Sequence, residues 1–205
     1  MPKFAKLLAL IGLLLLIYGL YNAYTIPAKI ESHRIVFLHV PAAITAYAAF
    51  TVSFASAVIY LRSGESKRDL LAYVSAKYGF SMALAAFLSG AIWAKVTWGA
   101  YFNWFEIREI IVLLLLFVYA IYFSLRNAVE TDKARVASIY LIIAFVTVPF
   151  SYVAGFFSPL HPKPFEAEFS ADWLTNLGIM ILAFLILYVA YALWEYKLSL
   201  EPKDS

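Results

Sequence analysis

Residues 111–123 read IVLLLLFVYAIYF, and residues 7–20 read LLALIGLLLLIYGL. Neither run alternates apolar with polar residues, as the strands of a membrane barrel would. Runs of this kind that extend to about 20 residues cross a bilayer as helices, because a helix satisfies its own backbone hydrogen bonds in lipid. These two stretches therefore predict membrane-spanning helices.

The composition extends this interpretation to the whole chain. Of its 205 residues, 64% are apolar and 14% are charged, with a mean hydropathy of +0.81. A soluble domain could not bury so large an apolar fraction. We predict an all-α integral membrane protein, a single domain over residues 1–205. Its six transmembrane helices are expected at about 5–24, 35–61, 70–94, 109–125, 136–157 and 173–194.

The basic residues indicate the orientation. Lys3 and Lys6 precede the first stretch as in a secretory leader, but the apolar run is longer than in a leader, so we expect it to remain as a helix. If the helices alternate, ten of the sixteen basic residues fall on the side of both termini and five on the other. The more basic side is cytoplasmic. We expect cytoplasmic N and C termini and a multi-pass protein of the cell (inner or plasma) membrane, surrounded by membrane lipid and with no nucleic-acid partner.

An aromatic run joins the third and fourth stretches. Residues 97–108 read TWGAYFNWFEIR, within an outer loop predicted at about 95–108. Offset aromatic rings favour flat apolar ligands, and Glu106 and Arg108 can hold polar groups at the rim of such a ligand. Tyrosine and tryptophan also collect at membrane interfaces, so the run by itself is equally compatible with anchoring.

The three histidines, His33, His39 and His161, all fall on the predicted outer side. His39 opens the second helix in RIVFLHVPAA (34–43), with Pro41 expected in the first turn; His161 lies in FFSPLHPKP (156–164), a proline-rich break. Two neutral imidazoles on opposite faces of a haem need nitrogens about 4 Å apart. For a single histidine at a wet helix end, capping or a hydrogen bond to the backbone is the favoured role, but a pair beside an aromatic loop favours a ligand site.

Three strings, RIVFLHVPAA, WGAYFNWFEIRE and FFSPLHPKP, occur in this order on six predicted helices. They resemble the CcmC family of haem-handling membrane proteins in cytochrome c maturation, part of the tryptophan-rich WWD-loop superfamily. The family has a His-Val-Pro element opening its second helix, an outer loop of the form WGxxWxWDxR and a second histidine before the last helix. The resemblance spans nearly the whole chain and implies that His39 and His161 are axial ligands of a non-covalent, b-type haem.

The rest of the site follows from the resemblance together with the chemistry of the residues. Arg34, which matches a family arginine, and Arg108 would clamp the haem propionates, and Glu106 would orient Arg108. The loop would form a platform under the macrocycle from Trp98, Gly99, Tyr101, Phe102, Trp104 and Phe105.

The chain departs from the family pattern in the loop and before the second histidine. It has one additional residue between Trp104 and Arg108, a phenylalanine, Phe102, at a tryptophan position, and Glu106 in place of the aspartate. Phe156 and Phe157 stand where the family carries two tryptophans. The chain is thus a divergent member, and the register of its loop against the pattern stays open.

The sequence contains no cysteine, so the chain has no thiol nucleophile and forms no thioether to haem. We expect a haem-binding and transfer factor without catalytic residues. The resemblance implies delivery of haem at the outer face to a CcmE-type haem chaperone, in association with ABC transporter subunits. Two alternatives remain: a membrane b-type cytochrome that uses the same histidines for electron transfer, and a transporter whose outer aromatics are only an interface belt.

Overall fold

A computed structural model of the protein describes residues 1–161 and 169–198. The described residues form helices without strands: α1 (Lys3–Thr25), η1 (Glu31–Ile35), α2 (Val36–Ser63), α3 (Ser66–Trp98), α4 (Ile107–Ala128), α5 (Lys133–Ala144), α6 (Thr147–Val153), η2 (Ala154–Phe156) and α7 (Ala171–Leu198). Six helical stretches are long and apolar enough to cross a bilayer. The prediction of an all-α membrane protein with six spans is confirmed.

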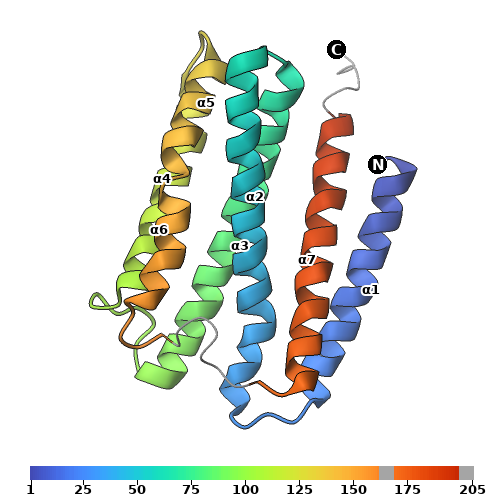
Figure 1. Cartoon of the computed structure of the whole chain (residues 1–205), viewed down its shortest axis with the longest axis vertical. Coiled ribbons are helices and arrows are strands. Elements are labelled where there is room, and N and C mark those ends of the chain that lie inside the picture. The colour runs from blue at the N-terminus through green and yellow to red at the C-terminus, as the bar shows by residue number, and fades with distance from the viewer. Residues whose placement is uncertain (162–168, 199–205) are drawn as a thin grey trace.

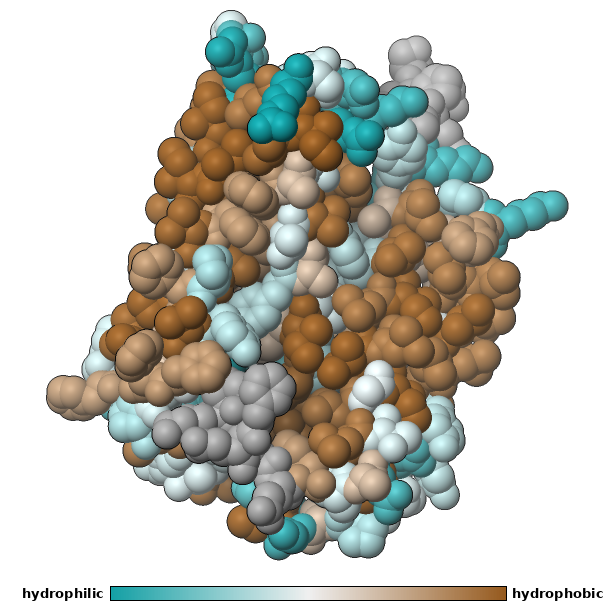
Figure 2. Space-filling model, in the orientation of Figure 1, coloured by the Kyte–Doolittle hydropathy of each residue, from teal (hydrophilic) through white to brown (hydrophobic). Residues whose placement is uncertain are grey.

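The spans form one bundle of roughly parallel and antiparallel helices (Figure 1). α1 and α7 pack together at one edge, α2 and α3 form the middle, and α4 lies with α5 and α6 at the other edge. The α1–α2 and α3–α4 connections and η2 gather at the end opposite the N terminus; we call this the loop end of the bundle. Hydrophilic residues concentrate at both ends of the molecule, with hydrophobic surface between them (Figure 2).

Small side chains build the contact between α2 and α3. Buried alanines recur at helical spacing on α2, at Ala42, Ala46 and Ala49. Across from them Gly79 on α3 lies so close to Phe50 that an added Cβ would be 2.7 Å from the ring carbon Cδ1. Because lipid is as apolar as a protein core, helices in a membrane associate through this kind of close packing.

The fifth span is broken, whereas the sequence predicts one helix over 136–157. α5 ends at Ala144 and α6 begins at Thr147. Pro149 explains the position of the break, because its ring would clash with the carbonyl four residues earlier, that of Phe145, and it has no N–H to donate. The chain tightens there into shorter turns: Val146 N donates to Ile143 O at 3.2 Å, and Val148 N to Phe145 O at 3.0 Å.

The helices next to the predicted outer loop are longer than expected. α3 continues to Trp98 and ends at Gly99, whose φ of 83° is the left-handed conformation that favours glycine. α4 begins at Ile107, so the irregular segment covers only residues 99–106.

α2 begins at Val36 directly after η1, which places Pro41 in its second turn rather than in the predicted first turn.

Candidate functional site

The two histidines singled out in the sequence lie next to each other. His39 is the fourth residue of α2, and His161 follows η2 in a segment where its N–H donates to Ser158 Oγ at 2.9 Å. Their ring centroids are 6.3 Å apart, with 39° between the ring planes. The fold therefore brings together two imidazoles that are far apart in the sequence.

α3 holds the ring of His39. Nδ1 lies 2.9 Å from Ala86 O and 3.2 Å from Ser89 Oγ. Since a carbonyl only accepts, the first contact requires that Nδ1 donate its proton, which leaves the lone pair on Nε2. Gly90 backs the ring, and an added Cβ there would lie 3.1 Å from His39 Cε1.

Arg108 contacts the other histidine. It lies in the first turn of α4, and its Nη1 is 3.2 Å from His161 Nδ1. A guanidinium always donates, so this Nδ1 accepts. The guanidinium passes over Gly155, where an added Cβ would lie 2.7 Å from Nη1. A residue on α4 thereby reaches the segment after η2.

Glu106 joins the same two elements through its carboxylate. Its side chain is fully buried; Oε1 accepts from Arg108 N, and Oε2 accepts from Leu160 N, each at 3.2 Å. Two backbone N–H groups thus stabilise the buried charge. The carboxylate caps α4 and holds the residue before His161, and it contacts the backbone of Arg108 instead of the guanidinium expected from the sequence.

Two tryptophans of α3 lie beside the histidines. Trp98, at the last position of the helix, meets Trp93 edge-on with centroids 5.2 Å apart. Trp93 in turn lies 6.3 Å from the rings of both His161 and His33. Sequence reasoning missed Trp93 because it falls inside the predicted third helix. Its position close before Trp98 on a helix that ends at the aromatic run would have indicated it.

The remaining aromatics of the run lie at the surface. Trp104 and Phe105 are 73% and 89% exposed, and Tyr101 is also exposed beside Lys95, whose Nζ lies 5.5 Å from the Tyr101 ring centroid. Phe102 is half-buried and meets Trp104 edge-on at 4.8 Å. The loop therefore presents an apolar, aromatic surface at the loop end of the bundle.

The sequence model of the CcmC family, described as heme exporter protein C, matches residues 1–204. The chain belongs to the CcmC family. Among its relatives, heme exporter protein C of Haemophilus influenzae is 26% identical over 215 residues, which cover 99% of this chain and 87% of that protein. Heme exporter protein C of Escherichia coli (strain K12) is 28% identical over 172 residues (82% and 70%). A ccmC-like mitochondrial protein of cytochrome c biosynthesis from Marchantia polymorpha is 28% identical over 175 residues (85% and 74%).

Membership in the CcmC family makes the chain a multi-pass membrane protein of haem transport in cytochrome c biogenesis. Arg34, which the resemblance matches to a family arginine, has local partners in the structure. Its guanidinium donates to Glu31 Oε2 at 2.6 Å and to the carbonyls of Ala23 and Ile26 at the end of α1. Phe156 and Phe157 are exposed, and residues 162–164 of the FFSPLHPKP motif lie outside the described residues.

Proposed function

We propose that the chain binds b-type haem non-covalently between His39 and His161, at the outer face of the cell membrane, and passes it to a CcmE-type haem chaperone. The separation of the two rings carries the proposal. With metal–nitrogen distances of about 2 Å on either side of an iron, the centroids of two axial imidazoles lie about 6 Å apart. The centroids of His39 and His161 are 6.3 Å apart.

The hydrogen bonding of His39 supports its role as a ligand. A ligating histidine usually donates its other ring N–H to a carboxylate, carbonyl or water, which sets the tautomer and the orientation of the ring. The bond from His39 Nδ1 to Ala86 O does this and leaves Nε2 available. Both histidines would then ligate as neutral imidazoles.

Arg108 must leave His161 when that ring ligates an iron. If Nδ1 ligates, it no longer accepts from the guanidinium; if Nε2 ligates, the ring proton moves to Nδ1, to which Arg108 cannot donate. In either case the guanidinium becomes available for a haem propionate, whose carboxylate matches its planar fork. Arg34 would require release from Glu31 to act in the same way, so Arg108 is the better candidate for the propionate contact.

The aromatic residues would hold the macrocycle and leave its edge accessible. Trp98 contacts Trp93, which in turn lies next to His161. Gly99 has open space at its Cβ position, so a flat ligand can approach the backbone there. The exposed Trp104 and Phe105 would meet the exposed part of the ligand or the chaperone that receives it. We also propose that the chain associates with ABC transporter subunits and that both of its termini are cytoplasmic.

Visible spectra of the protein purified in detergent test the ligands. We expect a Soret band in the wild type and its loss, or a shift to a five-coordinate form, in both His39→Ala and His161→Ala. His33→Ala is the matched control, because its ring also lies 6.3 Å from Trp93 yet is assigned no bond to iron, and it should keep the wild-type spectrum. An unchanged spectrum in either His39→Ala or His161→Ala contradicts bis-histidine ligation.

A second measurement separates delivery from permanent electron carriage. The haem-loaded protein is mixed with an apo CcmE-type chaperone, and haem on each protein is followed after separation. Delivery predicts that haem moves to the chaperone and that replacing Trp98 and Trp104 together by alanine slows the transfer. A membrane cytochrome would retain its haem under the same conditions.

A further inference from the structure

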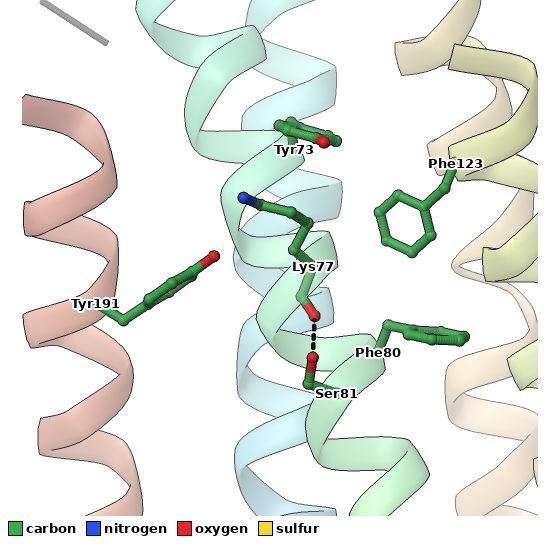
Figure 3. Close-up of a pocket in the computed structure, with 6 residues that line it drawn as sticks. All are labelled: Tyr73, Lys77, Phe80, Ser81, Phe123 and Tyr191. Atoms are coloured by element: carbon green, nitrogen blue, oxygen red, sulfur yellow. Dashed lines mark hydrogen bonds between the residues drawn. The ribbon is translucent and has the colours of Figure 1, made fainter. Parts of the chain in front are cut away.

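A pocket far from the histidines lies between α3, α4 and α7, on the half of the bundle where α3 begins and α7 ends. Its volume is about 310 Å³. Aromatic rings form most of its wall, and one lysine and one serine face it (Figure 3). The lining residues are Tyr73, Lys77, Phe80, Ser81, Phe123 and Tyr191.

Lys77 brings a charge into this pocket. Its Nζ donates to Glu195 Oε1 of α7 at 2.9 Å, and the Tyr191 hydroxyl donates to the same oxygen at 2.9 Å. The ammonium also lies 5.1 Å from the centroid of Tyr73 and 5.8 Å from that of Tyr191, within the range of cation–π attraction. The side chains of Lys77 and Glu195 nevertheless remain 32% and 27% exposed.

The depth of this ion pair in the bilayer limits which kinds of molecule can contact its exposed side. The 33 residues of α3 extend over about 50 Å, whereas the hydrocarbon core is about 30 Å thick. Lys77 is eleven residues from the start of α3, about 16 Å along the helix, and therefore about 6 Å inside the hydrocarbon if α3 is centred. In Figure 3 its side chain rises along α3 toward Tyr73, which is the direction of the membrane surface.

Contact with acyl chains alone would be unfavourable for a partly exposed ion pair, since charged groups at this depth face protein, water or lipid headgroups. The face of α3 that continues beyond Ser81 of the pocket is apolar and exposed, with Leu84 and Leu88 at helical spacing. A ligand that fits both the ion pair and this apolar face has a charged head and hydrocarbon tails.

We propose that this pocket binds a zwitterionic phospholipid. The phosphate accepts from Lys77, and the headgroup ammonium lies beside Glu195 and the faces of Tyr73 and Tyr191, while the acyl chains follow Leu84 and Leu88. Because Lys77 and Glu195 carry opposite charges, the pair matches a zwitterion better than a headgroup with net negative charge. The site is independent of haem binding.

Native mass spectrometry of the full chain tests the site, with phosphatidylethanolamine and phosphatidylglycerol supplied in equal amounts. Ser81→Phe fills the pocket without altering the ion pair, and Lys77→Gln combined with Glu195→Gln removes both charges without leaving one unpaired. We expect preferential retention of phosphatidylethanolamine by the wild type and at least a fivefold lower lipid-bound fraction in both variants. Lys133→Gln is the control, because it removes an exposed lysine at the start of α5.

Wild-type lipid retention in both pocket variants overturns the proposal. Preferential retention of phosphatidylglycerol overturns the match to a zwitterion, and an equal loss of lipid in Lys133→Gln shows binding to general surface charge. Ser81 is exposed, so Ser81→Phe is expected to fold. It therefore keeps the proposal testable if the double variant fails to fold.

Discussion

The side chains of the candidate site are positioned by glycines as much as by hydrogen bonds. Gly90 leaves room for the ring of His39 to lie against α3, and Gly155 leaves room for the guanidinium of Arg108. Metal ligands act within narrow limits of distance and angle, and a displacement of about 0.5 Å matters. The proposed site therefore requires residues without a Cβ atom at positions 90 and 155.

Gly90→Ala tests this at His39. The new Cβ would lie 3.1 Å from Cε1, the carbon between the two ring nitrogens, so the ring must shift by a few tenths of an ångström. We expect haem affinity to fall on the order of tenfold, while the helix gains up to about 1 kcal/mol in stability. Haem titration by absorbance and thermal unfolding in detergent measure the two effects. Gly178→Ala, with open space at its Cβ position, should leave haem affinity unchanged, and the prediction fails if Gly90→Ala does the same.

At the scale of elements, the site depends on how α4 and the segment after η2 are joined. The contact between Arg108 and His161 joins a residue in the first turn of α4 to a residue outside any helix. The carboxylate of Glu106 bridges them by accepting from one backbone N–H of each. This junction sets the distance between Arg108 and His161.

Glu106→Ala should separate the two elements. It removes the cap of α4 and leaves the Leu160 N–H without its acceptor, so we expect a loss of roughly 1–3 kcal/mol in the free energy of unfolding. Weaker haem binding should accompany it. Glu109→Ala is the matched control: Glu109 accepts from Asn103 N at 2.7 Å within the loop and has no part in the junction. Equal losses in the two variants, measured by unfolding and haem titration in detergent, would show that the junction has no special role.

The sequence predicts these elements better than their contacts. Each span follows from a run of about 20 apolar residues, because the thickness of the bilayer dictates that length. The break before Pro149 was accessible from proline chemistry, although the apolar run masks it. The contact of Arg108 with His161 and the bond from His39 to Ala86 O depend on how distant helices pack, which no local pattern encodes. Trp93 was missed for a different reason: a tryptophan inside a predicted helix is ordinarily a packing residue, although its position close before Trp98 indicated the site.

The two halves of the whole molecule are held differently. Toward the N-terminal end of the bundle, Arg126 of α4 makes a two-pronged contact with Asp69 of α3 at 2.7 and 2.6 Å, and Lys77 of α3 pairs with Glu195 of α7. Charged pairs therefore connect three helices in that half. At the loop end, hydrogen bonds of Glu106, Arg108 and His39 join the elements around the histidines. The proposed release of Arg108 thus needs no separation of the ion-paired helices.

Orientation in the membrane is the last property of the whole molecule to test, and the cysteine-free sequence suits it. Single cysteines at Ala100, in the exposed loop between α3 and α4, and at Glu130, between α4 and α5, report opposite ends of the bundle. Because the basic residues concentrate at the end of the termini, that end should face the cytoplasm. A membrane-impermeant maleimide should therefore label Ala100→Cys in intact cells and Glu130→Cys only after permeabilisation. The reverse pattern would put the histidines on the cytoplasmic side and exclude delivery of haem at the outer face.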